Sequence, residues 1–184
     1  MIDQKFTSRS MFDPSRWELL QKCADAVQYV SGHVLEIGCH KCGVIAWLGQ
    51  RFPQKQCIAF DRFEDGLSEL CPYDMVPSPS YHKGVQGSDY DDSVKFCSEW
   101  SNVKVVRGDV RKVLLWENDY KVSLALVDLN LYEPTIAALS WLKGRLSPGA
   151  IILVDDCEFE GVKAALEFGV VKWEKKGHMG VVKT

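Results

Sequence analysis

The sequence predicts an α/β fold: a mostly parallel, doubly wound sheet with helices on both faces and an antiparallel strand at its C-terminal end. Short apolar runs alternate with segments of helical spacing, which is the pattern of a parallel sheet. The run at 150–154 is entirely apolar, as in strands buried on both faces. Neither a repeat nor a low-complexity tract divides residues 1–184, so a single domain is expected.

The composition is that of a globular protein. Its 184 residues are 46% hydrophobic and 26% charged, and 22 basic against 25 acidic side chains give a net charge of −3. A chain of this length buries roughly 70% of its unfolded surface, which excludes a mainly disordered protein. The mild acidity and the lack of a basic block disfavour nucleic acid as a partner. No apolar stretch reaches the ~18 residues of a membrane span, so we expect a cytoplasmic protein without membrane contact.

The first third of the chain predicts a helical region followed by a strand, a helix and a second strand. Asp13 and Pro14 have the residue types of a helix N-cap and first position, within an N-terminal helical region at 1–31. Apolar residues recur there at helical spacing. The strands are expected at 33–38 and 56–61, and the helix between them at 44–51.

Residues 62–102 interrupt this alternation. Prolines and glycines break a polar, tyrosine-containing stretch, which precedes a possible helix at 91–100. About twenty residues without a predicted element inside a compact domain indicate a functional lid or a disordered loop. The alternation then resumes with strands at 103–107, 122–127, 150–154, 170–173 and 179–182 and with helices at 110–116, 134–146 and 161–168.

Ligands of doubly wound sheets bind at the carboxyl ends of the strands, and the first such end reads EIGCHKCG (36–43). A dinucleotide-binding turn needs a third glycine at position 40, where this chain has His40, so pyrophosphate is disfavoured. Glu36 would also repel phosphate, whereas a carboxylate at this position suits a cationic ligand. The sulfonium and α-ammonium groups of S-adenosylmethionine fit that requirement.

Acidic residues also follow the next two strands. Asp61 follows Gly38 at roughly the 20-residue spacing at which acidic side chains reach ribose hydroxyls in nucleoside-binding folds. Asp109 follows the third strand. Each residue alone is as well explained as a helix N-cap or a turn residue. Together with Glu36, however, they favour a nucleoside site.

Three aspartates follow the fourth and fifth strands: Asp128, Asp155 and Asp156. Neighbouring strands lie ~4.8 Å apart, so these carboxylates are expected to converge at one edge of the pocket. A hard divalent cation would offset their mutual repulsion, and Mg²⁺ is the favoured ion because it prefers carboxylate oxygens as ligands. The alternative is that one or two of them cap helices and that no metal binds.

The seven cysteines are an odd number and are scattered, which indicates reduced thiols rather than a secreted disulfide framework. Cys39 and Cys42 form a C-x-x-C between a strand and a helix, and in that position it can be a redox motif. A thiol oxidoreductase is therefore an alternative function. Zinc is less favoured, because a second C-x-x-C is absent.

Several segments resemble the TylF/MycF-type macrocin O-methyltransferase family. VDLNLYEPT (127–135) is similar to the family signature D-x-D-L-Y-E-x-T, and LSPG (146–149) followed by IILVDD (151–156) is similar to its continuation. FDRFE (60–64) and VRGD (106–109) resemble two further family motifs. The resemblance spans about 34–168, and its second half is the more specific.

The resemblance implies a Rossmann-like class I fold that uses S-adenosylmethionine, with a divalent metal held by Asp128, Asp155 and Asp156. It assigns residues 62–102 to acceptor binding and lid closure. It also implies a catalytic pair, Asp128 and a general base at His82. The residues predicted to contact the methyl donor are Glu36, Gly38, Cys39, His40, Gly43, Asp61, Arg62, Gly108, Asp109 and Asp128.

Three positions depart from the family pattern: Cys42 and Ala150 replace glycines, and Asn130 replaces a second aspartate. The Asn130 amide is suited to bind an acceptor hydroxyl, because it both donates and accepts hydrogen bonds. We therefore expect a Mg²⁺-dependent O-methyltransferase whose acceptor is a small-molecule hydroxyl, such as a sugar or a natural-product-like diol.

The alternative function is that of a methyltransferase-fold protein without metal chemistry, acting on nitrogen or on a macromolecule.

Aromatic residues in the N-terminal region and in the 62–102 segment are candidates for core packing, acceptor binding or a homodimer surface. These residues are Trp17, Tyr73, Tyr81 and Tyr90.

Overall fold

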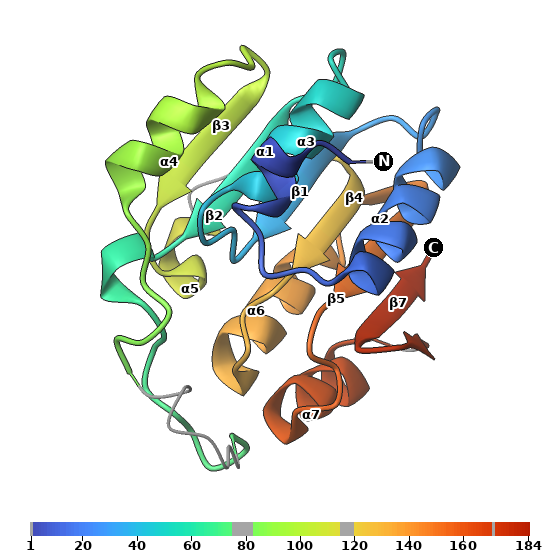
Figure 1. The fold of residues 1–184 in the computed structure, drawn as a ribbon. Helices are drawn as coiled ribbons and strands as arrows, with labels where there is room; N and C mark the ends of the chain where they lie inside the picture. Colours follow the sequence, from blue (N-terminus) through green and yellow to red (C-terminus); the bar gives the residue numbers. More distant parts are fainter. Residues whose placement is uncertain (1, 75–82, 115–119, 171) are drawn as a thin grey trace.

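The computed structural model describes residues 2–74, 83–114, 120–170 and 172–184, which build a seven-stranded sheet. The parallel strands are β1 (His33–Ile37), β2 (Cys57–Asp61), β3 (Val103–Arg107), β4 (Val122–Val127) and β5 (Leu146–Val154). β7 (Met179–Lys183) lies antiparallel to β5, and β6 (Glu174–Lys176) antiparallel to β7. The order is β3-β2-β1-β4-β5-β7-β6 (Figure 1). The predicted doubly wound sheet with antiparallel C-terminal strands is thereby confirmed.

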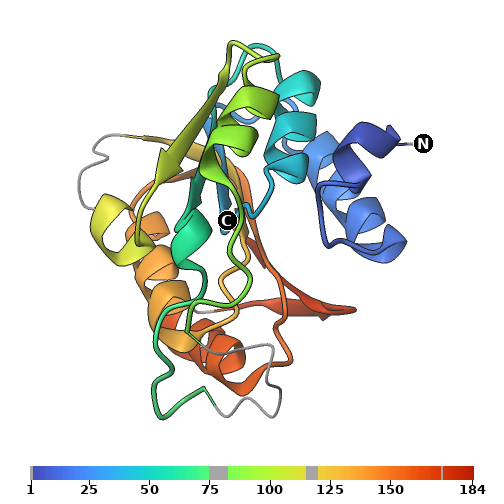
Figure 2. The same cartoon turned by 60° about the vertical axis from the view of Figure 1, so that its left-hand side comes forward.

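Helices cover both faces of the sheet (Figure 2). The first core packs under α1 (Gln4–Thr7), α2 (Pro14–Ala26), α3 (Gly43–Arg51) and α4 (Tyr90–Cys97), and the second under α5 (Val110–Val113), α6 (Tyr132–Leu142) and α7 (Glu160–Gly169). Successive strand residues serve opposite cores, because side chains alternate along a strand: Val34 joins the first core and Leu35 the second. Within the described ranges, none of the helices is long and apolar enough to cross a membrane.

The central strand β4 shows why a continuous apolar run forms a strand here. All its residues are buried between the two helical layers, and it pairs with both β1 and β5. Its polar member, Ser123, donates through Oγ to the carbonyl oxygens of Gly32 and His33, each at 3.1 Å. The buried hydroxyl is therefore satisfied, so its burial carries little cost.

The predicted N-terminal helical region contains two helices, α1 and α2, instead of one. Asp13 caps α2 as expected, with its carboxylate accepting from the backbone N–H groups of Ser15 at 2.7 Å and Arg16 at 3.1 Å. α2 ends at Ala26. Trp17 is only 5% exposed and packs in the first core, so it is a packing residue rather than part of a dimer surface.

The structure describes residues 62–74 and 83–102 of the predicted insertion. A 3-10 helix, η1 (Phe63–Asp65), follows β2, and α4 begins at Tyr90 after its N-cap Asp89. The buried carboxylate of Asp74 accepts from the Tyr132 N–H at 2.7 Å, which ties the insertion to the start of α6. The two described parts of the insertion are also paired, because Leu67 N–H donates to the carbonyl oxygen of Val85 at 2.9 Å.

The C-terminal elements differ from the prediction at their ends. α6 ends at Leu142, whereas the predicted helix ran to residue 146. β5 begins at Leu146, four residues before the predicted strand at 150–154. The strand expected at 170–173 lies instead at Glu174–Lys176, where it pairs with β7 through a turn at Gly177. Val170 and Trp173 pack against the second core, so their apolar character reflects core packing and not strand pairing.

Candidate active site

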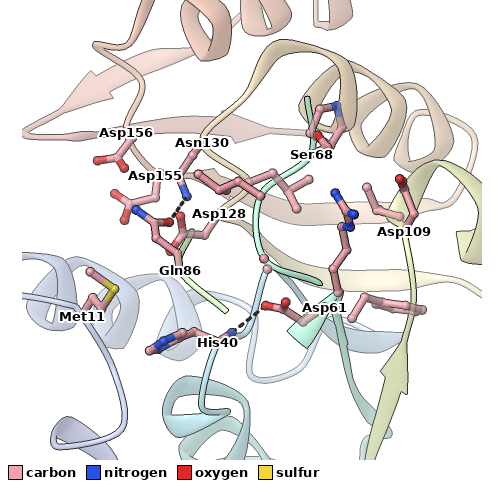
Figure 3. Close-up of a pocket in the computed structure, with 18 of the residues that line it drawn as sticks. Met11, His40, Asp61, Ser68, Gln86, Asp109, Asp128, Asn130, Asp155 and Asp156 are labelled. Atoms are coloured by element: carbon pink, nitrogen blue, oxygen red, sulfur yellow. Dashed lines mark hydrogen bonds between the residues drawn. The ribbon is translucent and has the colours of Figure 1, made fainter. Parts of the chain in front are cut away.

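A cavity of about 280 Å³ opens at the carboxyl ends of the parallel strands (Figure 3). Its place is the switch point between β1 and β4, where the strand order reverses. Its size is near the lower end of the roughly 300–1,000 Å³ of ligand pockets. The fold thus brings most of the predicted site residues to one cavity: Gly38, His40, Asp61, Arg62, Gly108, Asp109, Asp128, Asp155 and Asp156 line it.

Gly38 begins the glycine turn (38–43), where the chain leaves β1. Its φ of +93° is a conformation that side-chain-bearing residues rarely adopt. A Cβ at this position would lie 1.8 Å from the carbonyl oxygen of Asp128. The Asp128 N–H in turn donates to Ile37 O at 2.8 Å. Only glycine therefore permits the close passage of the two backbones that form this wall of the cavity.

Asp61 organises the loops around the cavity. Its Oδ2 accepts from the backbone N–H of His40 at 2.7 Å (Figure 3), and its Oδ1 accepts from the N–H of Phe63 at 2.8 Å. His40 and Phe63 both have positive φ, and these two bonds hold them there. The turn role that the sequence left open for Asp61 is thus present, on a residue that also lines the cavity.

His40 and Asp109 line the cavity with different electrostatic character. Burial lowers the pKa of His40, which favours the neutral imidazole, and its Nδ1 is buried with no partner among the described residues. Asp109 caps α5 and accepts from the Arg111 side chain, whose hydrogen bond lowers the pKa of Asp109. Asp109 is therefore both a helix cap and an anionic group on the cavity wall.

The structure does not bring Glu36, Cys39 or Gly43 to the cavity wall. Strand alternation turns Glu36 toward α3, where its Oε2 accepts from the Ile45 N–H at 2.6 Å. Burial raises the pKa of Glu36 well above its usual range. A Cβ on Gly43 would lie 2.4 Å from the carbonyl oxygen of Phe6, so that glycine serves the packing of α1 on α3.

The C-x-x-C residues belong to the glycine turn, and their side chains pack in the first core. The sulfur atoms of Cys39 and Cys42 are 3.3 Å apart, and both side chains are buried. Burial raises the pKa of Cys39 to about 12. The pKa of Cys42 lies far above its ordinary value, mainly because its thiol contacts that of Cys39. Neither thiol has the acidified, accessible character of a redox cysteine, which argues against the oxidoreductase alternative.

The three aspartates converge as the strand order predicted. One oxygen each from Asp128, Asp155 and Asp156 lies within 4.8 Å of the others (Figure 3). Burial is the main cause that raises the pKa of Asp128 well above its usual range, and the negative charges of Asp155 and Asp156 add to it. Burial and, to a smaller extent, the charge of Asp155 raise the pKa of Asp156 to about 6. A cluster of this kind favours a bound cation, and its all-oxygen donor set fits a hard divalent ion such as Mg²⁺.

Arg16, which no sequence pattern indicated as a site residue, reaches this cluster from the first turn of α2. Its Nε donates to Asp155 Oδ1 at 2.8 Å and its second terminal nitrogen to Asp156 Oδ1 at 2.9 Å. The other terminal nitrogen donates to Asp13 Oδ2 at 3.0 Å. No sequence signal joins position 16 to positions 155 and 156, because only the docking of α2 on the sheet brings them together.

Further cavity residues come from the N-terminal segment, the insertion and the segment that follows β4. Met11 lines the cavity from the N-terminal segment and Ser68 from the insertion. Asn130, with a φ of +62°, donates through its amide to the Gln86 side chain at 3.2 Å beside Asp128 (Figure 3). The predicted general base His82 lies outside the described residues.

Comparison with protein families and curated proteins gives one match. The family model described as "Methyltransferase domain" matches residues 35–157, which include the glycine turn, Asp61, Asp109 and the three-aspartate cluster. No curated protein matches the chain.

Solved structures share the fold at low sequence identity. The calicheamicin methyltransferase CalS11 has a TM-score of 0.70 and 18% identity, with 100% of this chain and 98% of that chain covered. The O-methyltransferase NovP has a TM-score of 0.77 and 15% identity, with 95% and 81% covered. A second CalS11 structure, described as an apo TDP-rhamnose 3'-O-methyltransferase, has a TM-score of 0.63 and 20% identity, with 91% and 79% covered.

Proposed function

Because this chain belongs to the methyltransferase-domain family, we propose that it moves a methyl group from S-adenosylmethionine to a hydroxyl oxygen of a small molecule. The observation that carries the proposal is the division of one cavity into two acidic ends. Asp61 and Asp109 lie toward one end, and Asp128, Asp155 and Asp156 lie toward the other (Figure 3). The first end suits a nucleoside, and the second suits an acceptor that is held through a cation.

The donor end is assigned to the residues around β2 and β3. A carboxylate has about four acceptor sites, so Asp61 can accept from ribose hydroxyls besides the two backbone N–H groups it already holds. Phe60 and Val110 give this end apolar walls suited to a nucleobase. When bound, S-adenosylmethionine supplies an activated methyl group, whose bond to sulfur breaks as its bond to the acceptor oxygen forms.

The acceptor end is assigned to the three-aspartate cluster. Asp128, Asp155 and Asp156 would hold a divalent cation, and Mg²⁺ is the ion we propose. Such a cation would supply Lewis acidity, which would polarise adjacent acceptor oxygens and lower the pKa of a hydroxyl held there. The amides of Asn130 and Gln86 lie beside the cluster and can orient acceptor hydroxyls, because each amide both donates and accepts.

The catalytic contribution of the chain is then mainly the positioning of two reactants in one cavity, which replaces a costly encounter in solution. Gly66, Leu67, Ser68 and Gln86 line the cavity from residues 62–102, which supports acceptor binding by that segment. His82 stays the proposed general base. Of the solved structures with this fold, CalS11 is described as a TDP-rhamnose 3'-O-methyltransferase, so a sugar diol is the first acceptor class to test.

A second candidate is a methyltransferase that works without a metal. The guanidinium of Arg16 favours it, because this cation already offsets part of the negative charge on Asp155 and Asp156. The two candidates differ in one property. The metal-dependent enzyme loses turnover in a chelator, whereas the second enzyme keeps it.

The testing experiment is calorimetric titration with S-adenosylmethionine, first with Mg²⁺ and then with EDTA, followed by a nucleotide-sugar diol and a catechol as acceptors. The proposal expects donor binding in both conditions and acceptor binding only with Mg²⁺. Asp155→Ala is expected to keep donor binding and to lose metal-dependent turnover. Absence of donor binding in both conditions would refute the methyl-donor assignment, and full activity of Asp155→Ala in EDTA would refute the metal assignment.

A further inference from the structure

Arg16 makes the densest set of ionic contacts at the three-aspartate cluster. Its nitrogen atoms reach Asp155, Asp156 and Asp13 at 2.8, 2.9 and 3.0 Å, and its side chain is only 17% exposed. Among the described residues, no other lysine or arginine forms an ion pair with Asp155 or Asp156. Charge-assisted bonds of this length are the strong kind, so Arg16 is the resident counter-cation of the cluster.

The guanidinium uses the same carboxylates that a divalent ion would need. It spans Asp155 and Asp156 through Oδ1 of each. A metal ion ligated by these two residues and Asp128 would stand next to the guanidinium, and the two like charges would repel across a half-buried site with reduced solvent screening. Each cation therefore weakens the binding of the other to these carboxylates.

From this we infer that Arg16 and a divalent cation compete for Asp155 and Asp156, so that metal binding requires the Arg16 side chain to leave the cluster. The inference rests on the metal assignment of the proposed function. Asp13 provides a place for the displaced side chain, because it already accepts from Arg16 and its own side chain is 39% exposed. Trp17, Leu20 and Ala24 anchor α2 in the first core, so the helix itself stays docked while one side chain swings out.

The test measures Mn²⁺ binding directly, by the loss of the free-ion signal in electron paramagnetic resonance. Arg16→Gln removes the positive charge, and Arg16→Lys keeps a charge that cannot span two carboxylates. The matched control is Arg9→Gln, because Arg9 is also in the N-terminal segment but pairs with Asp92. Asp128→Asn reports whether the ion binds at the cluster.

Competition predicts that Arg16→Gln lowers the Kd for Mn²⁺ about tenfold, that Arg16→Lys lowers it less, and that Arg9→Gln leaves it unchanged. Saturating Mn²⁺ should also raise the Tm of Arg16→Gln more than the Tm of the unaltered protein. Asp128→Asn should weaken binding in both backgrounds.

The contrary results separate this inference from the proposed function. If Arg16→Gln binds Mn²⁺ no more tightly than the unaltered protein does, the competition is refuted and the metal assignment stands. The same holds if Arg9→Gln tightens Mn²⁺ binding as much as Arg16→Gln does. If neither the unaltered protein nor Arg16→Gln binds Mn²⁺, the metal assignment fails and the competition fails with it. Binding of S-adenosylmethionine, measured on the same samples, then shows whether the donor assignment survives.

Discussion

Gly38 and Asp128 touch through their backbones at the switch point of the sheet, where a Cβ on residue 38 would lie 1.8 Å from the Asp128 carbonyl oxygen. The Asp128 N–H donates to the neighbouring Ile37 carbonyl at 2.8 Å, which extends the regular pairing that β1 and β4 keep from Val34 onward. The contact joins the glycine turn to the first residue of the three-aspartate cluster. A change at position 38 should therefore affect both ends of the cavity.

Gly38→Ala is expected to lower the free energy of unfolding by about 1–3 kcal/mol or more, because the new methyl group forces the two backbones apart. The positive φ adds strain for any side-chain-bearing residue. Urea unfolding measures the loss. The control is Gly144→Ala, since no heavy atom lies within 4 Å of a Cβ there. Equal stability of the two variants would contradict the close contact.

Asp61→Asn should weaken S-adenosylmethionine binding about tenfold, because one of its two acceptor oxygens becomes an NH₂ group facing a backbone N–H. The lost bond is the one to His40 or to Phe63, and either loss loosens a loop that lines the cavity. Calorimetry measures the affinity. Asp65→Asn, at an exposed residue of η1, is the matched control. Unchanged affinity in Asp61→Asn would exclude an organising role for this carboxylate.

Glu36 should make the stability depend on pH. Burial raises the pKa of its carboxyl well above the usual range, so its contribution is fully present below the ordinary carboxyl pKa and is lost as the pH rises toward the folded-state pKa. Glu36→Gln removes this titration while keeping an oxygen for the Ile45 N–H. The stability of the variant relative to the unaltered protein should rise from about pH 5 to about pH 7, by at most about 1.4 kcal/mol per unit.

Urea unfolding at successive pH values measures this dependence on Glu36. The control is Glu160→Gln, because Glu160 is exposed at the start of α7. Its stability difference from the unaltered protein is expected to stay constant over the same range. A constant difference for Glu36→Gln as well would mean that the buried carboxyl titrates normally in the folded protein.

Cys39 and Cys42 should resist iodoacetamide at about pH 8, because burial raises the pKa of Cys39 to about 12 and little thiolate forms below that value. Cys71, the cysteine that is only partly buried, is the internal reference and should react first. Mass spectrometry of the labelled peptides measures the order. Labelling of Cys39 as fast as that of Cys71 would restore the thiol oxidoreductase as a candidate.

Local patterns suffice to predict most of the sheet. β4 has the predicted ends, because a nearly unbroken apolar run between turn residues has one favourable place, inside the sheet. β3 also has the predicted ends, although it is an edge strand in which the exposed Lys104 and Arg107 accompany three valines. β6 shows the limit of this reasoning. Its residues Glu174–Lys176 are exposed and charged, and they form a strand because they pair with β7, a partner that no local pattern reveals.

The three-aspartate cluster follows from local patterns, because Asp128 and Asp155 come directly after the parallel strands β4 and β5, and the ends of neighbouring parallel strands meet at one edge of the sheet. Side-chain direction and helix docking belong to the tertiary structure alone. Strand alternation and the position of α3 turn Glu36 away from the cavity, and the docking of α2 brings Arg16 to carboxylates distant in sequence. The physical reason is that spacing along a chain fixes neighbours within an element, whereas contacts between elements depend on how whole faces pack.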